Sequence, residues 1–159
     1  MRRQVLLRFL IPVLVVLHFF LHLGLGIVRG APDLLTLALL LAAREVGMGA
    51  GAGLGFFFGL LEDAFSVLAF GANALAMTVV GILGARTRDL FVGDSLLFFF
   101  WYLAGGKWVR DLIHWIVAGE GARGPVLNAL VIDGSLAAVY VAIIGLLLLI
   151  PLGGKEALR

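Results

Sequence analysis

The stretch Val46–Asp63 reads VGMGAGAGLGFFFGLLED and places a glycine at every fourth position. These glycines are Gly47, Gly51, Gly55 and Gly59, and a second, interleaved pair is Gly49 and Gly53. In a soluble helix each glycine costs about 1 kcal/mol relative to alanine. A membrane helix tolerates them because lipid forces the backbone to satisfy its hydrogen bonds internally. Small residues at this spacing also let a second helix approach closely, so the stretch predicts a closely packed membrane helix.

The composition supports a membrane location. Of the 159 residues, 62% are hydrophobic and only 14% are charged, and the mean hydropathy is +1.13. Because soluble domains are less apolar, we predict an all-α integral membrane protein with a single transmembrane domain over residues 1–159. The chain contains no cysteine, which excludes disulfides, thiolate metal sites and cysteine nucleophiles. Its basic residues are scattered, so no nucleic-acid partner is predicted.

Six apolar runs predict a bundle of six transmembrane helices. Their approximate ranges are Val5–Val28, Leu34–Ala43, Val46–Leu61, Gly71–Ala85, Leu90–Ala118 and Val126–Ile150. The first run is too long for the apolar core of a signal peptide, so we expect an uncleaved helix. Pro32 is placed to begin the second helix, and Pro151 is placed to end the sixth. A loop or broken helix at the outer membrane surface is expected at Glu62–Phe70, and a polar loop is expected at Arg86–Asp89.

The second and third predicted helices are short. At 1.5 Å per residue, Leu34–Ala43 covers about 15 Å, which is half of a hydrocarbon core of about 30 Å. Either the two helices extend into their polar flanks, or they form a shallow hairpin among the other helices. We favour a position inside the bundle for the glycine-rich helix, with Asp63 fixing its outer end.

The positive residues predict the orientation. With six spans and an inner N-terminus, eight basic residues flank the inner side and two flank the outer side, leaving aside those within the fifth helix. The inner set is Arg2, Arg3, Arg8, Arg44, Arg86, Arg88, Lys155 and Arg159, and the outer set is Arg29 and Arg123. Because cytoplasmic flanks carry an excess of Lys and Arg, both termini are predicted to be cytoplasmic.

The fifth predicted helix carries charges at membrane depth. One face bears Lys107, Arg110, Asp111 and His114, spaced i, i+3, i+4 and i+7. An adjacent stripe consists of Trp101, Trp108 and Trp115. We predict that the charges pair with each other and with Asp133 of the sixth helix. A ligand pathway is one alternative, and a helix break at Gly105–Gly106 that lays the charged part on the membrane surface is another.

Other polar residues indicate packing rather than catalysis. His18 and His22 lie four residues apart with no third ligand nearby, so hydrogen bonds between helices are predicted instead of a metal site. The Gly-x-Gly-Asp and Gly-x-Ser-x-Gly signatures of membrane and serine hydrolases are absent. We therefore predict no catalytic residue, metal or cofactor. Asp63 is expected to accept the backbone N–H groups of the segment that follows it.

Three pieces of the central segment carry a family resemblance. They are Pro32-Asp33-Leu34-Leu35, Gly55-Phe56-Phe57-Phe58-Gly59-Leu60-Leu61-Glu62-Asp63 and Gly71-Ala72-Asn73-Ala74-Leu75. In this order and spacing they resemble MreD, the rod shape-determining membrane protein family of bacteria. The resemblance implies a non-catalytic, multi-pass subunit of the inner (plasma) membrane, with a fold similar to the substrate-binding S components of energy-coupling-factor transporters. It also implies binding to MreC within the elongasome, the peptidoglycan-synthesis machine that contains MreB, RodA and a penicillin-binding transpeptidase.

The sequence therefore favours a membrane scaffold. Its candidate docking surfaces are the glycine series and the tryptophan stripe, although packing of the glycines within the chain is favoured over docking. The alternative is a small-molecule (vitamin) binding subunit of an energy-coupling-factor-type transporter, which would need convergent polar side chains near the outer surface. The candidates for such a pocket are Glu62, Asp63, Asn73, Lys107 and His114. An intramembrane enzyme is the third alternative.

Overall fold

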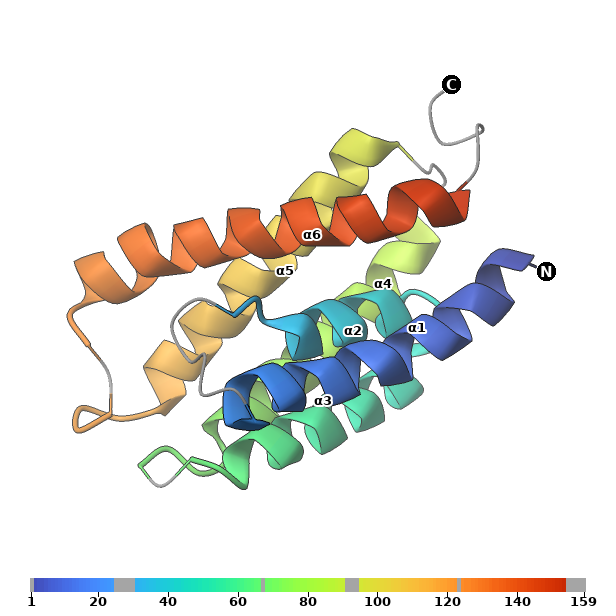
Figure 1. Ribbon diagram of the computed structural model, residues 1–159. Coiled ribbons are helices and arrows are strands. Elements are labelled where there is room, and N and C mark those ends of the chain that lie inside the picture. Colours follow the sequence, from blue (N-terminus) through green and yellow to red (C-terminus); the bar gives the residue numbers. More distant parts are fainter. Residues whose placement is uncertain (1, 25–30, 67, 91–94, 123, 154–159) are drawn as a thin grey trace.

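The computed structural model describes residues 2–24, 31–66, 68–90, 95–122 and 124–153, and all regular structure in these ranges is helical (Figure 1). The α-helices are α1 (Arg2–Phe19), α2 (Leu34–Ala43), α3 (Met48–Asp63), α4 (Ala72–Leu90), α5 (Leu96–Val117) and α6 (Ser135–Gly153). Two π-helical segments extend α1 and precede α6, and these are η1 (Phe20–Gly24) and η2 (Leu127–Gly134). By length and composition, Leu6–Leu23 and Leu127–Ile150 are suited to cross a membrane.

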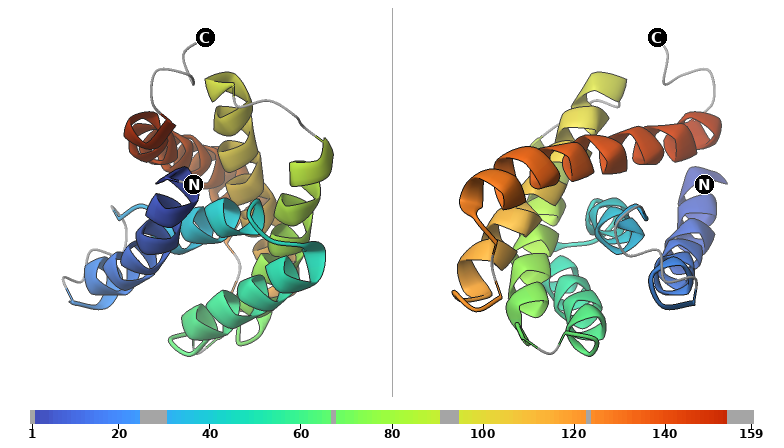
Figure 2. Two further views of the ribbon diagram at one scale, coloured as in Figure 1. Left: turned by 90° about the vertical axis from the view of Figure 1, so that its right-hand side faces the viewer. Right: turned by 60° about the vertical axis from the view of Figure 1, so that its left-hand side comes forward.

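Helix α2 occupies the centre of the molecule. All of its residues are buried, and it contacts α1, α3, α4, α5 and α6 (Figure 2). Glycines on three neighbours make room for its leucines, because Leu40 packs on Gly84 and Gly106 while Leu37 packs on Gly145. The predicted bounds of this short helix are confirmed, and its length is explained by its burial among longer helices.

Helix α3 lies at the edge of the bundle. Its buried residues are Gly51, Gly55, Phe58, Gly59 and Asp63. On its outer side Phe56 and Phe57 are more than half exposed, and no atom lies near a Cβ built on Gly49 or Gly53. The prediction that this helix is enclosed in the bundle is therefore wrong. The cause is that its small-residue face is complementary to α4 and that α2 covers a further part of it, whereas its outer side meets no other helix in the described part of the chain.

The glycine series of α3 packs against the backbone of α4. The contacts are Gly51 with Gly81, Gly55 with Met77, and Gly59 with Asn73 and Ala74. A Cβ on Gly51 would lie 2.5 Å from the carbonyl oxygen of Gly81, so neither helix has room for a side chain there. Gly47 does not take part, since it precedes the first turn of α3 and has open space around it. Packing within the chain is thus confirmed for three of the four glycines.

Several predicted helix ends are wrong. Helix α4 continues through the predicted loop Arg86–Asp89, α3 includes Glu62 and Asp63, and α5 begins at Leu96, later than predicted. Helix α5 also passes through Gly105–Gly106 without a break, which rules out the surface-helix alternative. Polar residues and glycines do not end these helices because the i→i−4 hydrogen bonds continue through them.

Two prolines differ from their predicted roles. Helix α2 begins after Asp33, whose carboxylate accepts the Thr36 N–H at 2.9 Å, so Asp33 is the N-cap and Pro32 precedes it. Helix α6 contains Pro151 and ends at Gly153. A proline in the last turn removes one backbone donor without displacing the rest of the helix. Residues 25–28 of the first predicted helix lie outside the described part of the chain.

Successive helices alternate in direction (Figure 1). The start of α1 and the end of α6 lie at one end of the bundle, while the starts of α2 and α4 and the ends of α3 and α5 lie at the other. We call this second end the polar end. It is defined by Asp33, Glu62, Asp63, Asn73, Lys107, Arg110 and Asp111.

Candidate functional site

The charged face of α5 points into the bundle at the polar end. Lys107 is 5% exposed and Arg110 is 8% exposed, although both carry a positive charge. A buried charge is strongly unfavourable unless it is paired and hydrogen-bonded. The surroundings of these two side chains therefore decide whether the site is structural or free to bind a ligand.

Lys107 is paired with two carboxylates. Its Nζ lies 2.5 Å from Oδ1 of Asp111, one turn further along α5, and 3.2 Å from Oδ2 of Asp33 at the start of α2. The lysine thus joins α5 to the N-terminal end of the central helix. Pairing with Asp111 was predicted from the spacing, whereas Asp33 was not identified as a partner.

Arg110 joins three helices. Its Nη2 donates to Oε1 of Glu62 at 2.7 Å and to Oδ1 of Asn73 at 2.5 Å, and its Nη1 donates to Oδ1 of Asp111 at 3.1 Å. Glu62 lies in the last turn of α3 and Asn73 in the first turn of α4, so one guanidinium holds α3, α4 and α5 together. An arginine suits this role because its planar guanidinium presents several donors in fixed directions.

Asp33 combines a helix cap with an ion pair. Besides the Thr36 N–H, its carboxylate accepts the Thr36 hydroxyl at 2.7 Å. Burial alone would raise the pKa of Asp33, but the positive charges of Lys107 and Arg110 outweigh that effect and hold its pKa below the usual range. Asp33 is therefore ionised under ordinary conditions and stabilises the start of α2 through both contacts.

His18 connects α1 to this end of α2. Its Nδ1 accepts the backbone N–H of Leu35 at 3.3 Å and lies 4.0 Å from Oδ1 of Asp33. The His22 ring stacks on it with the ring centroids 4.2 Å apart, and His22 Nδ1 lies 2.9 Å from the His18 carbonyl oxygen. The predicted hydrogen bond between helices is thus confirmed for His18.

Asp63 fixes the start of α4. It is fully buried, and its two carboxylate oxygens accept the backbone N–H groups of Gly71, Asn73 and Ala74 at 2.9, 3.1 and 2.9 Å. The first N–H groups of a helix have no partner within the helix, so a carboxylate from α3 supplies one. The positive φ of 91° at Gly71 lets the chain turn towards it. The predicted role of Asp63 is confirmed.

The tryptophan stripe does not form one continuous surface. Trp108 donates from Nε1 to the Leu130 carbonyl at 3.2 Å, and Trp115 donates to the Gly124 carbonyl at 2.9 Å. These two residues hold the segment that leads into α6 against α5. Trp101 is 65% exposed and remains open to a partner or to lipid.

Asp133 is not a partner of the α5 charges. It is exposed on η2, and its predicted place is taken by Asp33 and Glu62. Which carboxylates pair with Lys107 and Arg110 depends on which helix ends meet at the polar end. The packing of helices that are distant in sequence decides which ends meet. One available signal was that Asp33 and Glu62 lie at the ends of the second and third predicted helices, on the same side of the bundle as Arg110.

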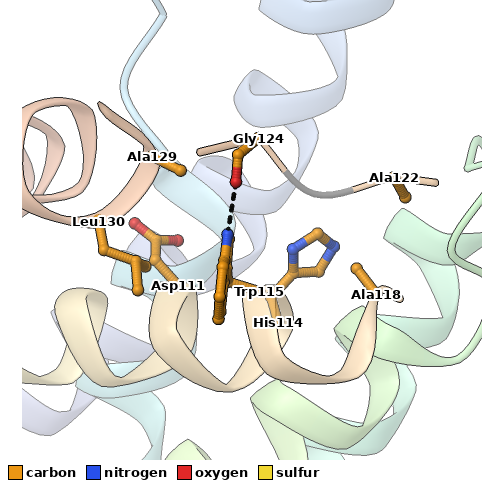
Figure 3. Close-up of a pocket in the computed structure, with 8 residues that line it drawn as sticks. All are labelled: Asp111, His114, Trp115, Ala118, Ala122, Gly124, Ala129 and Leu130. Carbon is orange, nitrogen blue, oxygen red and sulfur yellow. Dashed lines mark hydrogen bonds between the residues drawn. The ribbon is translucent and has the colours of Figure 1, made fainter. Parts of the chain in front are cut away.

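A small pocket lies beside this network. It has a volume of about 230 Å³ and is formed by α5, the connection to η2 and the first turns of η2. Its lining consists of Asp111, His114, Trp115, Ala118, Ala122, Gly124, Ala129 and Leu130 (Figure 3). Of the five residues predicted for a ligand pocket, only His114 lines it. Glu62, Asp63, Asn73 and Lys107 instead bind other protein groups.

Comparisons of the chain with protein-family models, with curated proteins and with solved structures found no match. The polar end can do two things chemically: it can hold helices together through paired charges, and it can offer a small polar pocket to a ligand.

Proposed function

We propose that this chain is a non-catalytic scaffold of the MreD type in the bacterial inner membrane. The observation that carries the proposal is the joint between α3 and α4. Gly59 packs on Asn73 and Ala74, and Asp63 accepts hydrogen bonds from Gly71, Asn73 and Ala74. The two larger pieces of sequence that resemble MreD thus meet at one contact, and there they hold two helices together.

The use of the polar side chains supports a structural role. Asp33, Glu62, Asn73 and Asp111 bind Lys107 and Arg110, and this network links α2, α3, α4 and α5. Removing one partner from a buried ion pair costs about 3–5 kcal/mol. Charges used in this way hold the helices in one arrangement and so present a constant outer surface to other proteins.

The outer surface supports a position within lipid. Large apolar side chains are exposed along the outsides of the helices, among them Phe9, Val16, Leu97, Leu136 and Leu147. Contiguous exposed apolar surface marks a protein or membrane contact. We propose that all six helices lie across the bilayer, with both termini cytoplasmic and the polar end on the outer side.

The partner in this proposal is an MreC-type membrane protein, and the wider assembly contains MreB, RodA and a penicillin-binding transpeptidase. Gly51, Gly55 and Gly59 are covered by α4, so they are not free for docking. Two surfaces stay open: the outer face of α3 at Gly53, which lies beside the predicted glycine series, and the predicted face of α5 at Trp101. Gly105 lies one turn from Trp101 and also has open space around it.

Two variants test these surfaces without disturbing the core. In the native bacterium, deletion of the gene should convert rods to round cells, and the wild-type gene should restore rods. Gly53→Leu and Gly105→Leu each add a side chain where no atom is near, so each serves as the folding control for the other. One of them should abolish co-purification with the MreC-type partner and fail to restore rods.

Unchanged cell shape after deletion would overturn the scaffold proposal. Full binding and full rescue by both variants would remove these two faces as docking surfaces. The vitamin-binding alternative predicts that a small molecule co-purifies with the chain. The polar pocket of about 230 Å³ is smaller than the 300–1,000 Å³ usual for such ligands. A cavity of about 400 Å³ on α1 has only apolar lining, so the scaffold is the better-supported function.

A further inference from the structure

The pocket at the polar end has walls of two kinds. Asp111, His114 and Trp115 project into it from one face of α5 (Figure 3). The remaining walls are small or apolar, and they are Ala118, Ala122, Gly124, Ala129 and Leu130. Small residues leave the volume, and the three α5 side chains give it polar character. Ligand sites in proteins combine these two features.

The carboxylate of Asp111 has one engaged oxygen. Lys107 and Arg110 both donate to Oδ1, and in the described part of the chain every hydrogen bond to this carboxylate ends on that oxygen. An ionised carboxylate offers about four acceptor positions over its two oxygens. Because Asp111 lines the pocket, its Oδ2 atom is suited to accept a further N–H.

Trp115 forms a fixed wall next to that carboxylate. Its indole N–H donates to the Gly124 carbonyl at 2.9 Å (Figure 3), so the orientation of the ring is set by the protein. The face of an indole ring attracts a cation through its quadrupole, an interaction of about 0.5–2 kcal/mol. A carboxylate beside a tryptophan ring of fixed orientation therefore favours the binding of a positively charged group.

The charges of the polar end favour the same ligand. Lys107 and Arg110 supply two positive charges, whereas the carboxylates number four: Asp33, Glu62, Asp63 and Asp111. Part of the excess is offset at the N-terminal ends of α2 and α4, where Asp33 and Asp63 accept backbone N–H groups. Asp111 has no such helix end and shares Lys107 and Arg110 with Asp33 and Glu62, so a cation in the pocket would add to the compensation of its charge.

We propose that this pocket binds a protonated primary amine, with the ammonium donating to Asp111 and lying against Trp115. A volume of about 230 Å³ fits a group of the size of ethanolamine. Two sources share this chemistry, namely a free small amine and the headgroup of phosphatidylethanolamine. Exposed Leu127, Val131 and Ile132 on η2 offer apolar surface to the acyl chains of such a lipid. The proposal does not depend on the scaffold function.

The experiment uses the purified full chain in two arms. In the first, phosphatidylglycerol nanodiscs contain either phosphatidylethanolamine or phosphatidylcholine, and native mass spectrometry counts the retained lipid. In the second, ethanolamine or neutral ethylene glycol is titrated into the detergent-solubilised protein by calorimetry. Retention of phosphatidylethanolamine over phosphatidylcholine identifies the lipid source, because the quaternary amine has no N–H to donate. Saturable binding of ethanolamine alone identifies a free amine.

Two variants place the binding in this pocket. Ala129→Leu fills the space and leaves every charge in place, and Asp111→Asn removes the acceptor charge. Each should weaken amine binding at least tenfold. The matched controls are Ala50→Leu on the exposed part of α3 and Asp133→Asn on η2, and both should bind as the wild type does.

Ala129→Leu decides the result if Asp111→Asn fails to fold, since it does not touch the ion pairs. Wild-type affinity in the folded Ala129→Leu variant would overturn the proposal. Failure of both arms to detect binding above the phosphatidylcholine and ethylene glycol references would overturn it as well. Neither result bears on cell shape, so the scaffold function stands or falls separately.

Discussion

At the level of single residues, Asp63 and Asp133 are opposites despite their identical chemistry. Asp63 is buried and binds three backbone N–H groups, whereas Asp133 is exposed on η2. A hydrogen bond to a charged group contributes about 1.5–3 kcal/mol. The two positions therefore form a matched pair for measuring how much one carboxylate contributes to the bundle.

Asp63→Ala should lower the free energy of unfolding by about 3 kcal/mol or more, because three backbone N–H groups, two of them buried, lose their acceptor. Asp133→Ala should change it by less than about 0.5 kcal/mol, as is usual for exposed positions. Reversible unfolding in mixed micelles, followed by circular dichroism, measures both. Equal losses in the two variants would show that Asp63 does not fix the start of α4.

Arg110 and Glu62 test the ion-pair network. Arg110→Met leaves Glu62 and Asp111 with less compensation and should cost about 3–5 kcal/mol. Adding Glu62→Gln removes one of the stranded charges, so the double variant should be more stable than the sum of the two single effects predicts. A double-mutant cycle in the same unfolding assay should give a coupling energy of about 1–3 kcal/mol. Additive effects would mean that the 2.7 Å contact contributes nothing.

At the level of helices, α3 has two glycine faces with opposite surroundings. Gly51, Gly55 and Gly59 touch the α4 backbone, while Gly49 and Gly53 have open space around them. The two sets interleave along one short helix and look alike in the sequence. Their difference comes from α4, which presents Ala74, Thr78, Gly81 and Ala85 at a spacing of three to four residues. That spacing is the signal that identifies α4 as the partner.

Gly53→Ala and Gly55→Ala form the corresponding test. At Gly53 an added methyl meets no atom, so the variant should gain up to about 1 kcal/mol from helix propensity. At Gly55 the methyl would overlap the Met77 carbonyl, so α3 and α4 must separate at a cost of about 1–3 kcal/mol. Thermal denaturation of the two variants in one detergent checks whether Gly53→Ala raises the stability while Gly55→Ala lowers it. A stability change in the same direction for both variants would contradict the assignment of Gly55 to the face of α3 that packs on α4.

At the level of the whole molecule, the alternating helices place the α4 end and the α5–α6 connection at opposite ends of the bundle. The proposed orientation puts the first inside the cell and the second outside. The chain has no cysteine, so a single introduced cysteine gives an unambiguous label. Arg88 and Gly121 are exposed at the two ends and suit this purpose.

Gly121→Cys should react with a membrane-impermeant maleimide in intact spheroplasts, and Arg88→Cys should react only after the membrane is permeabilised. The reason is that an impermeant reagent reaches only the outer side. Gel-shift labelling measures both variants, and the wild-type chain is the unlabelled control. Labelling of both cysteines in intact spheroplasts, or the reverse pattern, would contradict the proposed topology.

The sequence by itself determined features that depend on neighbouring residues. Apolar runs predicted the helices, and α2 has its predicted bounds. The i, i+3, i+4 spacing predicted that Lys107, Arg110 and Asp111 share a face, and the position of Asp63 predicted its contacts with the following segment. All of these follow from local periodicity and from the unpaired N–H groups of a helix start, which act over one or two turns.

Only the tertiary structure decided which surfaces meet. It pairs Arg110 with Glu62 at a separation of 48 residues and leaves Asp133 exposed. It also covers Gly55 and leaves Gly53 open. These choices depend on how helices far apart in the sequence fit together, and the glycine spacing within α3 alone does not say which helix is its neighbour. The glycine-rich stretch shows both levels, because its pattern predicts close packing while the fold selects α4 as the partner.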